Sequence, residues 1–178
     1  CALPILATAD IQWYPNEALA RAGQRLLRTQ PQLMGTYPSG TGLPALKHEL
    51  IRHLFSGGVE LKPEEILITQ GSTEAMHLAL RAVTQAGDTV IVESPVYFGL
   101  LQLIESLGLR ALEIPAGLHG KGISLETLEY ALEQTGSVKA IILMPCFQNP
   151  LGTTMSNGDK RKLMRIVARY PDITQIGR

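Results

Sequence analysis

Short apolar segments alternate with helix-like segments from Ile66 onward. Each apolar segment is bounded by turn residues, which favours buried strands over helices. The predicted strands are Ile66–Thr69, Thr89–Glu93, Arg110–Ile114 and Val138–Met144. The predicted helices are Thr73–Ala86, Tyr97–Leu107, Ser124–Gln134 and Asn157–Arg169. This rhythm predicts an α/β fold, a three-layer α/β/α arrangement with a mainly parallel sheet and right-handed crossovers.

Two further helices are expected before this alternation begins. They are Asn16–Thr29 and Leu43–Phe55, joined by a Gly- and Pro-rich loop. Near the other end, Ser156 and Asp159 form a capping-box pattern that marks a helix start, and Ser124 is an expected N-cap. No internal repeat and no linker divides the sequence, so residues 1–178 are expected to form one domain.

Composition excludes several classes of function. The 178 residues include Lys+Arg 16 and Asp+Glu 16, which argues against a nucleic-acid-binding face over the whole chain. Two cysteines, Cys1 and Cys146, supply neither a disulfide scaffold nor a spaced set of metal ligands. His48 and His53 lie on different helical faces and make no metal pair. No apolar run approaches the roughly 18 residues that span a bilayer. We expect a soluble, cytoplasmic protein without membrane contact.

An anion-binding loop is the first candidate for chemistry. Gln70–Gly71–Ser72–Thr73 follows a predicted strand and opens a predicted helix. Glycine allows a tight turn, the first N–H groups of a helix point at any anion placed there, and the Ser72 and Thr73 hydroxyls add donors. The loop matches neither a Walker A motif nor a G-x-G-x-x-G fingerprint. The alternative is a simple strand-to-helix turn with Ser72 as cap.

Aromatic and amide side chains follow two other predicted strands. Tyr97 comes after Glu93 and Pro95, where its ring could lie flat against a planar ligand or simply pack on the sheet edge. Asn149 sits before Pro150 in a stiff loop, so its amide is either aimed at one acceptor or caps the loop. Cys146 has no histidine placed to activate it and is interpreted as an ordinary thiol.

The order and spacing of these segments resemble the fold type I, pyridoxal-phosphate-dependent aminotransferases of class I/II. The resemblance covers the chain from about Tyr14 to Tyr170. It rests on Tyr37-x4-Gly42-Leu43-x2-Leu46, Ile68–Ala75, Gly87–Asp88–Thr89-x3-Glu93-x-Pro95-x-Tyr97 and Gln148–Asn149–Pro150-x-Gly152. Tyr97–Phe98–Gly99 and Leu112–Glu113–Ile114–Pro115 are most similar to the MocR-type subgroup of the GntR family. Those regulators join an N-terminal winged-helix DNA-binding domain to an aminotransferase-like domain.

The resemblance implies roles around pyridoxal 5'-phosphate. The amides around Gly71, with Ser72 and Thr73, would hold the cofactor phosphate. Tyr97 would stack on the pyridine ring, and Asn149 would hydrogen-bond its phenolic oxygen. Tyr37 would reach the phosphate of the neighbouring subunit in a homodimer. These six positions are the expected cofactor-binding residues.

Three catalytic residues of the family are not found in the sequence. The family needs a lysine for the Schiff base, an aspartate at the pyridine nitrogen and a distal arginine for the substrate carboxylate. None of the lysines has the required context; they are Lys47, Lys62, Lys121, Lys139, Lys160 and Lys162. We therefore interpret residues 1–178 as a partial large domain with cut ends at Cys1 and Arg178, itself inactive and without covalently bound cofactor. Because strands would then be missing beside Val138–Met144, an exposed sheet edge and self-association are expected.

The expected parent is a MocR-type regulator that senses an amino acid or amine and binds DNA only through an N-terminal domain. The alternative is a free-standing class I/II aminotransferase that exchanges an amino group between an amino acid and a 2-oxo acid. A third interpretation is an α/β scaffold or dimerisation piece with no ligand.

Overall fold

The computed structural model describes residues 10–37, 40–117 and 122–177. The chain groups into two compact units, Cys1–Ile68 and Thr69–Arg178. The sequence contains no obvious linker at that boundary, so this division was not expected. Each unit is described by itself below.

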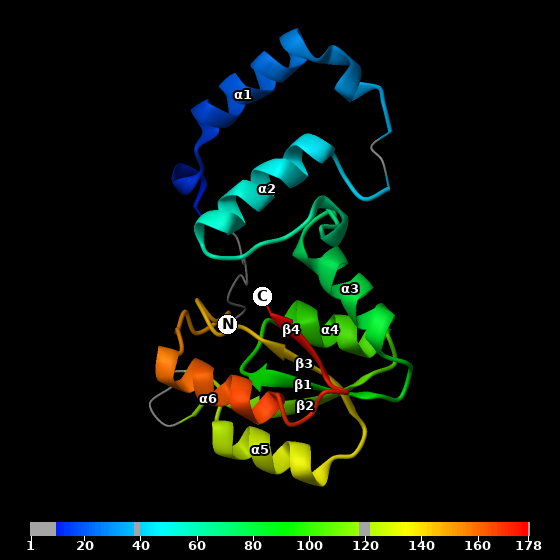
Figure 1. The fold of residues 1–178 in the computed structure, drawn as a ribbon, viewed down its shortest axis with the longest axis vertical. Helices are drawn as coiled ribbons and strands as arrows, with labels where there is room; N and C mark the ends of the chain where they lie inside the picture. The colour runs from blue at the N-terminus through cyan, green and yellow to red at the C-terminus, as the bar shows by residue number, and fades with distance from the viewer. Residues whose placement is uncertain (1–9, 38–39, 118–121, 178) are drawn as a thin grey trace, which may run out of the picture. The chain divides into compact units, whose positions relative to one another are not determined.

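Within its described residues, 10–37 and 40–68, the first unit contains two α-helices and three short 3₁₀ turns (Figure 1). Helices α1 (Asn16–Thr29) and α2 (Pro44–Ser56) confirm the two predicted N-terminal helices to within one residue at each end. The 3₁₀ turns are η1 (Ile11–Trp13), η2 (Pro31–Met34) and η3 (Pro63–Glu65). Pro44 stands at the start of α2, where its missing N–H costs no helical hydrogen bond.

The strand predicted at Ile66–Thr69 is wrong for the structure described here, because this segment belongs to no strand. Its Ile68 N–H donates to the Thr41 carbonyl oxygen at 3.1 Å. Gly42 lies so close that a Cβ on it would be 2.4 Å from Cγ1 of Ile68. The β-branched composition is compatible with a strand, but a ladder also needs a neighbouring strand to bond with.

The second unit is built on a parallel sheet in the order β2-β1-β3-β4. Its strands are β1 (Thr89–Ser94), β2 (Arg110–Pro115), β3 (Val138–Leu143) and β4 (Thr174–Gly177). This confirms the predicted parallel sheet and adds β4, which the sequence did not predict. It also corrects the expectation of an exposed edge at Val138–Met144, because β3 pairs with β1 on one side and with β4 on the other.

Helices cover both faces of this sheet (Figure 1). They are α3 (Ser72–Val83), α4 (Phe98–Ser106), α5 (Leu125–Gln134) and α6 (Asn157–Val167). Val90 and Val92 pack in one apolar cluster with side chains from α3 and α4, whereas Ile91 packs in a second cluster with side chains from α5 and α6. Successive strand residues point to opposite faces, so this split confirms the predicted three-layer α/β/α arrangement.

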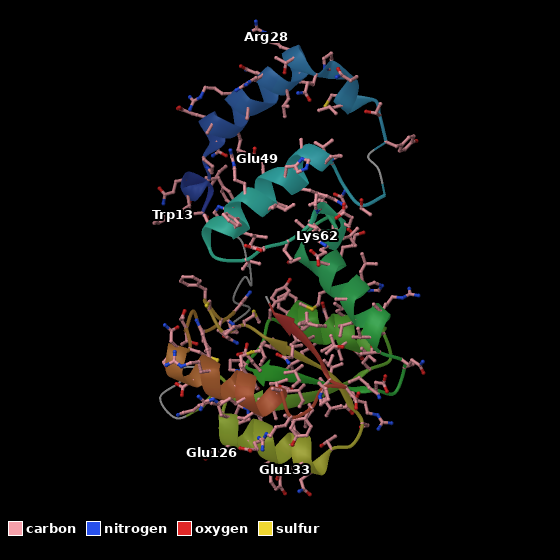
Figure 2. The ribbon with its side chains drawn as sticks, viewed as in Figure 1. Trp13, Arg28, Glu49, Lys62, Glu126 and Glu133 are labelled. Carbon is pink, nitrogen blue, oxygen red and sulfur yellow. The ribbon has the colours of Figure 1, made fainter. Side chains whose placement is uncertain are left out.

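Local capping explains why α5 and α6 begin where the sequence predicts. The Ser124 hydroxyl accepts from the Thr127 N–H at 3.3 Å, and the Ser156 hydroxyl accepts from the Asp159 N–H at 3.1 Å. Figure 2 shows Glu126 and Glu133 on the outer side of α5, and both are exposed. Glu126 and Glu133 thus face water, whereas Glu129 of the same helix pairs with Arg169.

The described residues limit two further functions. Among them, no helix is both long and apolar enough to pass through a membrane. Nor do three His, Cys, Asp or Glu side chains come together there in a way that could hold a metal ion.

Candidate functional site

The carboxyl ends of β1 and β3 place two loops beside each other in the second unit. β1 and β3 are hydrogen-bonded neighbours and run in parallel, so the chain leaves both strands at the same edge of the sheet. Tyr97 follows β1 and Asn149 follows β3. In open α/β sheets, this edge is where ligands bind.

A hollow at this edge brings together three of the predicted site residues. Ser72 and Thr73 from α3 and Tyr97 from the loop after β1 line it. The rest of its lining is mainly apolar and comes from Met76, Gly99, Leu100, Leu103, Ile142 and Met144. Two hydroxyl-bearing residues at a helix start therefore share one hollow with an aromatic ring and an apolar wall.

The start of α3 has the geometry of an anion site. Gly71 is the N-cap with φ 96°, a backbone conformation that glycine adopts readily. Ser72 is the first helical residue, which corrects the alternative in which Ser72 caps the helix. Glu74 accepts from the N–H of Gln70, which lies before the cap. Ser72 and Thr73 are exposed at this helix end, and the first N–H groups of a helix point toward an anion placed there.

Tyr97 is the N-cap residue of α4 and is half-buried. Its ring lies against Gly99, and its centroid is 4.8 Å from that of Phe98, with the two rings tilted by 53°. The ring therefore packs at the sheet edge, as one interpretation predicts. It also lines the hollow, as the stacking interpretation requires.

The other three predicted residues are Gly71, which is the N-cap of α3, Asn149 and Tyr37. Asn149 is half-buried in the loop after β3, but it is not among the described residues that line the hollow. Tyr37 belongs to the first unit, where its side chain is fully exposed. The roles predicted for both stay predictions.

Sequence reasoning missed Glu93 and Gln148, each with only 3% of its surface exposed. Burial raises the pKa of the Glu93 carboxyl above its ordinary value. The hydrogen bond from the Met144 N–H, and the Gln148 side chain, lower that pKa but offset only part of the effect. The signal for Glu93 in the sequence is an acidic residue directly after the apolar residues Val90–Val92.

Cys146 is exposed in the loop after β3, and Lys160 Nζ lies 3.0 Å from its Sγ. The sequence predicted an ordinary thiol because no histidine was placed near it. The contact with a lysine was not predicted, and Cys146 is not among the residues that line the hollow.

The arrangement fits a phosphorylated aromatic molecule. The α3 N-terminus and the hydroxyls of Ser72 and Thr73 suit a phosphate group, and Tyr97 with the apolar lining suits a planar ring beside it. Neither feature would select that chemistry alone. Their presence in one hollow makes a phosphorylated ring compound a candidate ligand.

A family model described as aminotransferase class I and II matches residues 8–174. The chain is 36% identical over 164 residues to the uncharacterized HTH-type transcriptional regulator YdcR of Escherichia coli, covering 92% of the chain and 35% of that protein. It is 31% identical to 2-aminoadipate transaminase of Thermus thermophilus, covering 86% of the chain and 37% of the enzyme. It is also 28% identical to a probable rhizopine catabolism regulatory protein, MocR, of Rhizobium meliloti, covering 90% and 31%. The chain thus spans about a third of the length of these relatives, which include both MocR-type regulators and aminotransferases.

Solved aminotransferase structures share the fold. An archaeal alanine:glyoxylate aminotransferase matches with a TM-score of 0.84 and 31% identity, over 94% of this chain and 42% of the other. LysN, the α-aminoadipate aminotransferase of Thermus thermophilus, was solved with N-(5'-phosphopyridoxyl)-L-leucine and matches with a TM-score of 0.81 and 29% identity, over 94% and 41%. The order of strands and helices, the hollow at the strand ends and these matches agree: the chain belongs to the class I and II aminotransferase family.

Proposed function

We propose that this chain forms the phosphate- and ring-binding part of a pyridoxal phosphate site. The observation that carries the proposal is the single hollow lined by Ser72, Thr73 and Tyr97. The relatives and solved structures support it, since one of the latter contains a phosphopyridoxyl compound. The site predicted from the sequence is therefore proposed as the functional one.

Each residue has a distinct task in this proposal. Ser72 and Thr73, with the first amides of α3, bind the phosphate and fix one end of the cofactor. Tyr97 stacks on the pyridine ring and keeps water from that face. Asn149 bonds the phenolic oxygen, and Tyr37 acts toward a neighbouring subunit of a homodimer. Those last two roles rest on the family resemblance alone.

When bound, pyridoxal phosphate supplies an electron-withdrawing ring that stabilises negative charge on carbon next to an amino nitrogen. The residues named here bind and orient the cofactor, and none of them is a base for that chemistry. The lysine, aspartate and arginine that the family uses would come from other parts of the protein. This accords with relatives about three times as long as the chain.

We propose that the whole protein is a cytoplasmic, MocR-type transcriptional regulator. Its aminotransferase-like domain would sense an amino acid or amine, and a separate N-terminal domain would bind DNA. The neutral balance of charge within this chain is compatible with DNA binding elsewhere in the protein. The 36% identity to the regulator YdcR favours this proposal over the alternative below.

The second candidate is a free-standing class I/II aminotransferase that uses an amino acid and a 2-oxo acid. The 31% identity to 2-aminoadipate transaminase favours it, and the same residues would bind the same cofactor. The two candidates differ in what precedes the domain. A winged-helix segment encoded upstream in the same reading frame supports the regulator, and its absence supports the enzyme.

Binding of pyridoxal phosphate and of inorganic phosphate, measured by calorimetric titration, tests the site itself. A Ser72→Ala, Thr73→Ala double variant is expected to weaken both ligands about tenfold or more, because charge-assisted bonds to the phosphate are lost. Ser106→Ala, which removes an exposed hydroxyl at the end of α4, is the matched control and should leave both affinities unchanged. If the double variant binds both ligands as the unmodified chain does, the assignment of the anion site to Ser72 and Thr73 is wrong. That result would favour the interpretation of the chain as a scaffold with no ligand.

A further inference from the structure

Two buried polar side chains connect the loops that follow β1 and β3. Glu93 lies near the end of β1, and Gln148 lies in the loop after β3. Burial of a carboxyl group and of an amide is costly unless both are hydrogen-bonded. The role of this pair is therefore found in the hydrogen bonds that offset the cost of burial.

The hydrogen bonds of the two side chains cross from one loop to the other. Glu93 Oε2 accepts from the backbone N–H of Met144, directly after β3, at 2.9 Å. In the opposite direction, Gln148 Nε2 donates to the carbonyl oxygen of Pro95, directly after β1, at 2.7 Å. A side chain near the end of β1 thus holds the backbone directly after β3, and a side chain in the loop after β3 holds the backbone directly after β1.

Gln148 also fixes its own loop. Its side-chain Oε1 accepts from the Leu151 N–H at 2.8 Å, and its backbone N–H donates to the Thr153 carbonyl oxygen at 2.9 Å. Asn149 is the next residue after Gln148, and Tyr97 follows Pro95 by two positions. The bond between Gln148 and Pro95 consequently joins the chain beside Asn149 to the chain beside Tyr97. Met144, which donates to Glu93, lines the hollow together with Tyr97.

A small cavity lies next to this pair. Glu93, Gln148 and Thr153 line it, and its volume of about 10 Å³ has room for roughly one water molecule. Glu93 Oε1 and Thr153 Oγ1 are buried and have no hydrogen-bond partner within the described part of the chain. One water molecule in the cavity would satisfy both atoms.

We propose that Glu93 and Gln148 are positioning residues that set the distance between the Tyr97 loop and the Asn149 loop, and so the fit of the cofactor ring. The inference rests on the proposed function. The inference also goes beyond that function, because it assigns a role to two side chains that do not contact the phosphate position at Ser72 and Thr73. Loss of either bond should loosen recognition of the ring and leave recognition of a bare phosphate intact.

The test compares two ligands in the 178-residue chain. Glu93→Leu, which replaces the acceptor with an apolar side chain, should weaken binding of pyridoxal phosphate about tenfold, while binding of inorganic phosphate stays within about twofold. Glu93→Gln keeps an acceptor for Met144 and should leave both affinities within about twofold. Glu105→Ala, an exposed carboxylate on α4, is the control. Equal losses for both ligands, or none for either, would overturn the inference.

Two further measurements keep the test decisive. If Glu93→Leu does not fold, Gln148→Met removes the bond to Pro95 from the other side and must give the same selective loss. In the free chain, the backbone amide resonance of Tyr97 must shift in Gln148→Met and that of Asn149 must shift in Glu93→Leu, and both must stay in place in Glu105→Ala. This NMR measurement needs no ligand, so it separates failure of the positioning role from failure of the phosphate site. Resonances that do not shift would reject the positioning role.

Discussion

The ring of Tyr97 lies directly over Gly99. A Cβ added to Gly99 would be 2.4 Å from Cε1 of Tyr97 and 2.9 Å from its hydroxyl oxygen, closer than real Cβ atoms approach other atoms. The absence of a side chain at Gly99 therefore sets where the Tyr97 ring lies. Since that ring lines the hollow, Gly99 shapes the proposed ring site without offering any polar group.

Gly99→Ala is expected to push the Tyr97 ring aside. Affinity for pyridoxal phosphate should fall about five- to tenfold through lost stacking, whereas affinity for inorganic phosphate should hold. Calorimetric titration with both ligands measures this. The control is Gly158→Ala, because Gly158 is also the second residue of its helix, α6, and the nearest atom to an added Cβ is at 3.5 Å. Equal affinities in Gly99→Ala and Gly158→Ala would contradict the packing role.

Gly71→Ala should destabilise the start of α3. Gly71 has φ 96°, and nothing lies within 4 Å of an added Cβ, so the penalty comes from the backbone conformation and not from a clash. We expect the free energy of unfolding to drop by about 1–2 kcal/mol in urea titration. Gly136 also has open space around an added Cβ but no positive φ, so Gly136→Ala should cause no comparable loss. A similar drop in both variants would argue against backbone strain at Gly71.

Local signals account for the parts of the fold that were predicted well. The starts of α5 and α6 follow from Ser124 and Ser156, which bond to backbone within three residues and so leave a mark in the sequence itself. Ile66–Thr69 was read as a strand from composition, but pairing depends on neighbours that composition does not reveal. Strand β4 was not predicted because its composition is not typical of a strand. It is short and mixes polar Thr174 and Gln175 with Ile176, yet it pairs with β3.

The same contrast between local sequence signals and long-range contacts holds at the candidate site. Ser72, Thr73 and Tyr97 were predicted because short motifs at helix starts are visible in the sequence, although the strand expected before Ser72 does not form, and the structure gathers the three residues in one hollow. Glu93 was missed because its partner, Met144, is 51 residues away in sequence. Gly99 was missed because its importance depends on where the Tyr97 ring lies.

Ser156→Ala should remove the N-cap of α6. The Ser156 hydroxyl accepts from the Asp159 N–H and donates to Asp159 Oδ2 at 2.7 Å, and its loss should lower the free energy of unfolding by about 1 kcal/mol. That hydroxyl, with a smaller contribution from Lys162, holds the pKa of Asp159 below its ordinary value. In the variant, NMR titration should find the Asp159 pKa raised toward that value.

Ser124→Ala is the matched control for this cap. Ser124 accepts from the Thr127 N–H at 3.3 Å and has a threonine, not a carboxylate, at the third helical position. Both variants should lose stability, but only Ser156→Ala should also change how stability depends on pH. A lowered folded-state pKa stabilises the protein above the unfolded-state pKa and is lost as pH falls, so the deficit of Ser156→Ala should shrink in acid. A deficit that is constant with pH would contradict the link to Asp159.

The contribution of Glu93 to stability should depend on pH in the direction opposite to that of Asp159. Its folded-state pKa is raised, so the folded protein holds a proton that the unfolded chain releases. The contribution of Glu93 to stability is therefore complete below the unfolded-state pKa of glutamate, about 4.3, and is lost as pH rises through the folded-state value. Glu93→Gln has no proton to release at this position. The free energy of unfolding of the variant minus that of the unmodified chain should increase from pH 4 upward and then level off, because other titrating groups cancel in the difference. Urea titrations of both proteins across that range measure it. A difference that stays flat with pH would mean that the pKa of Glu93 is the same in the folded and the unfolded protein, and a difference that falls would mean that folding lowers it.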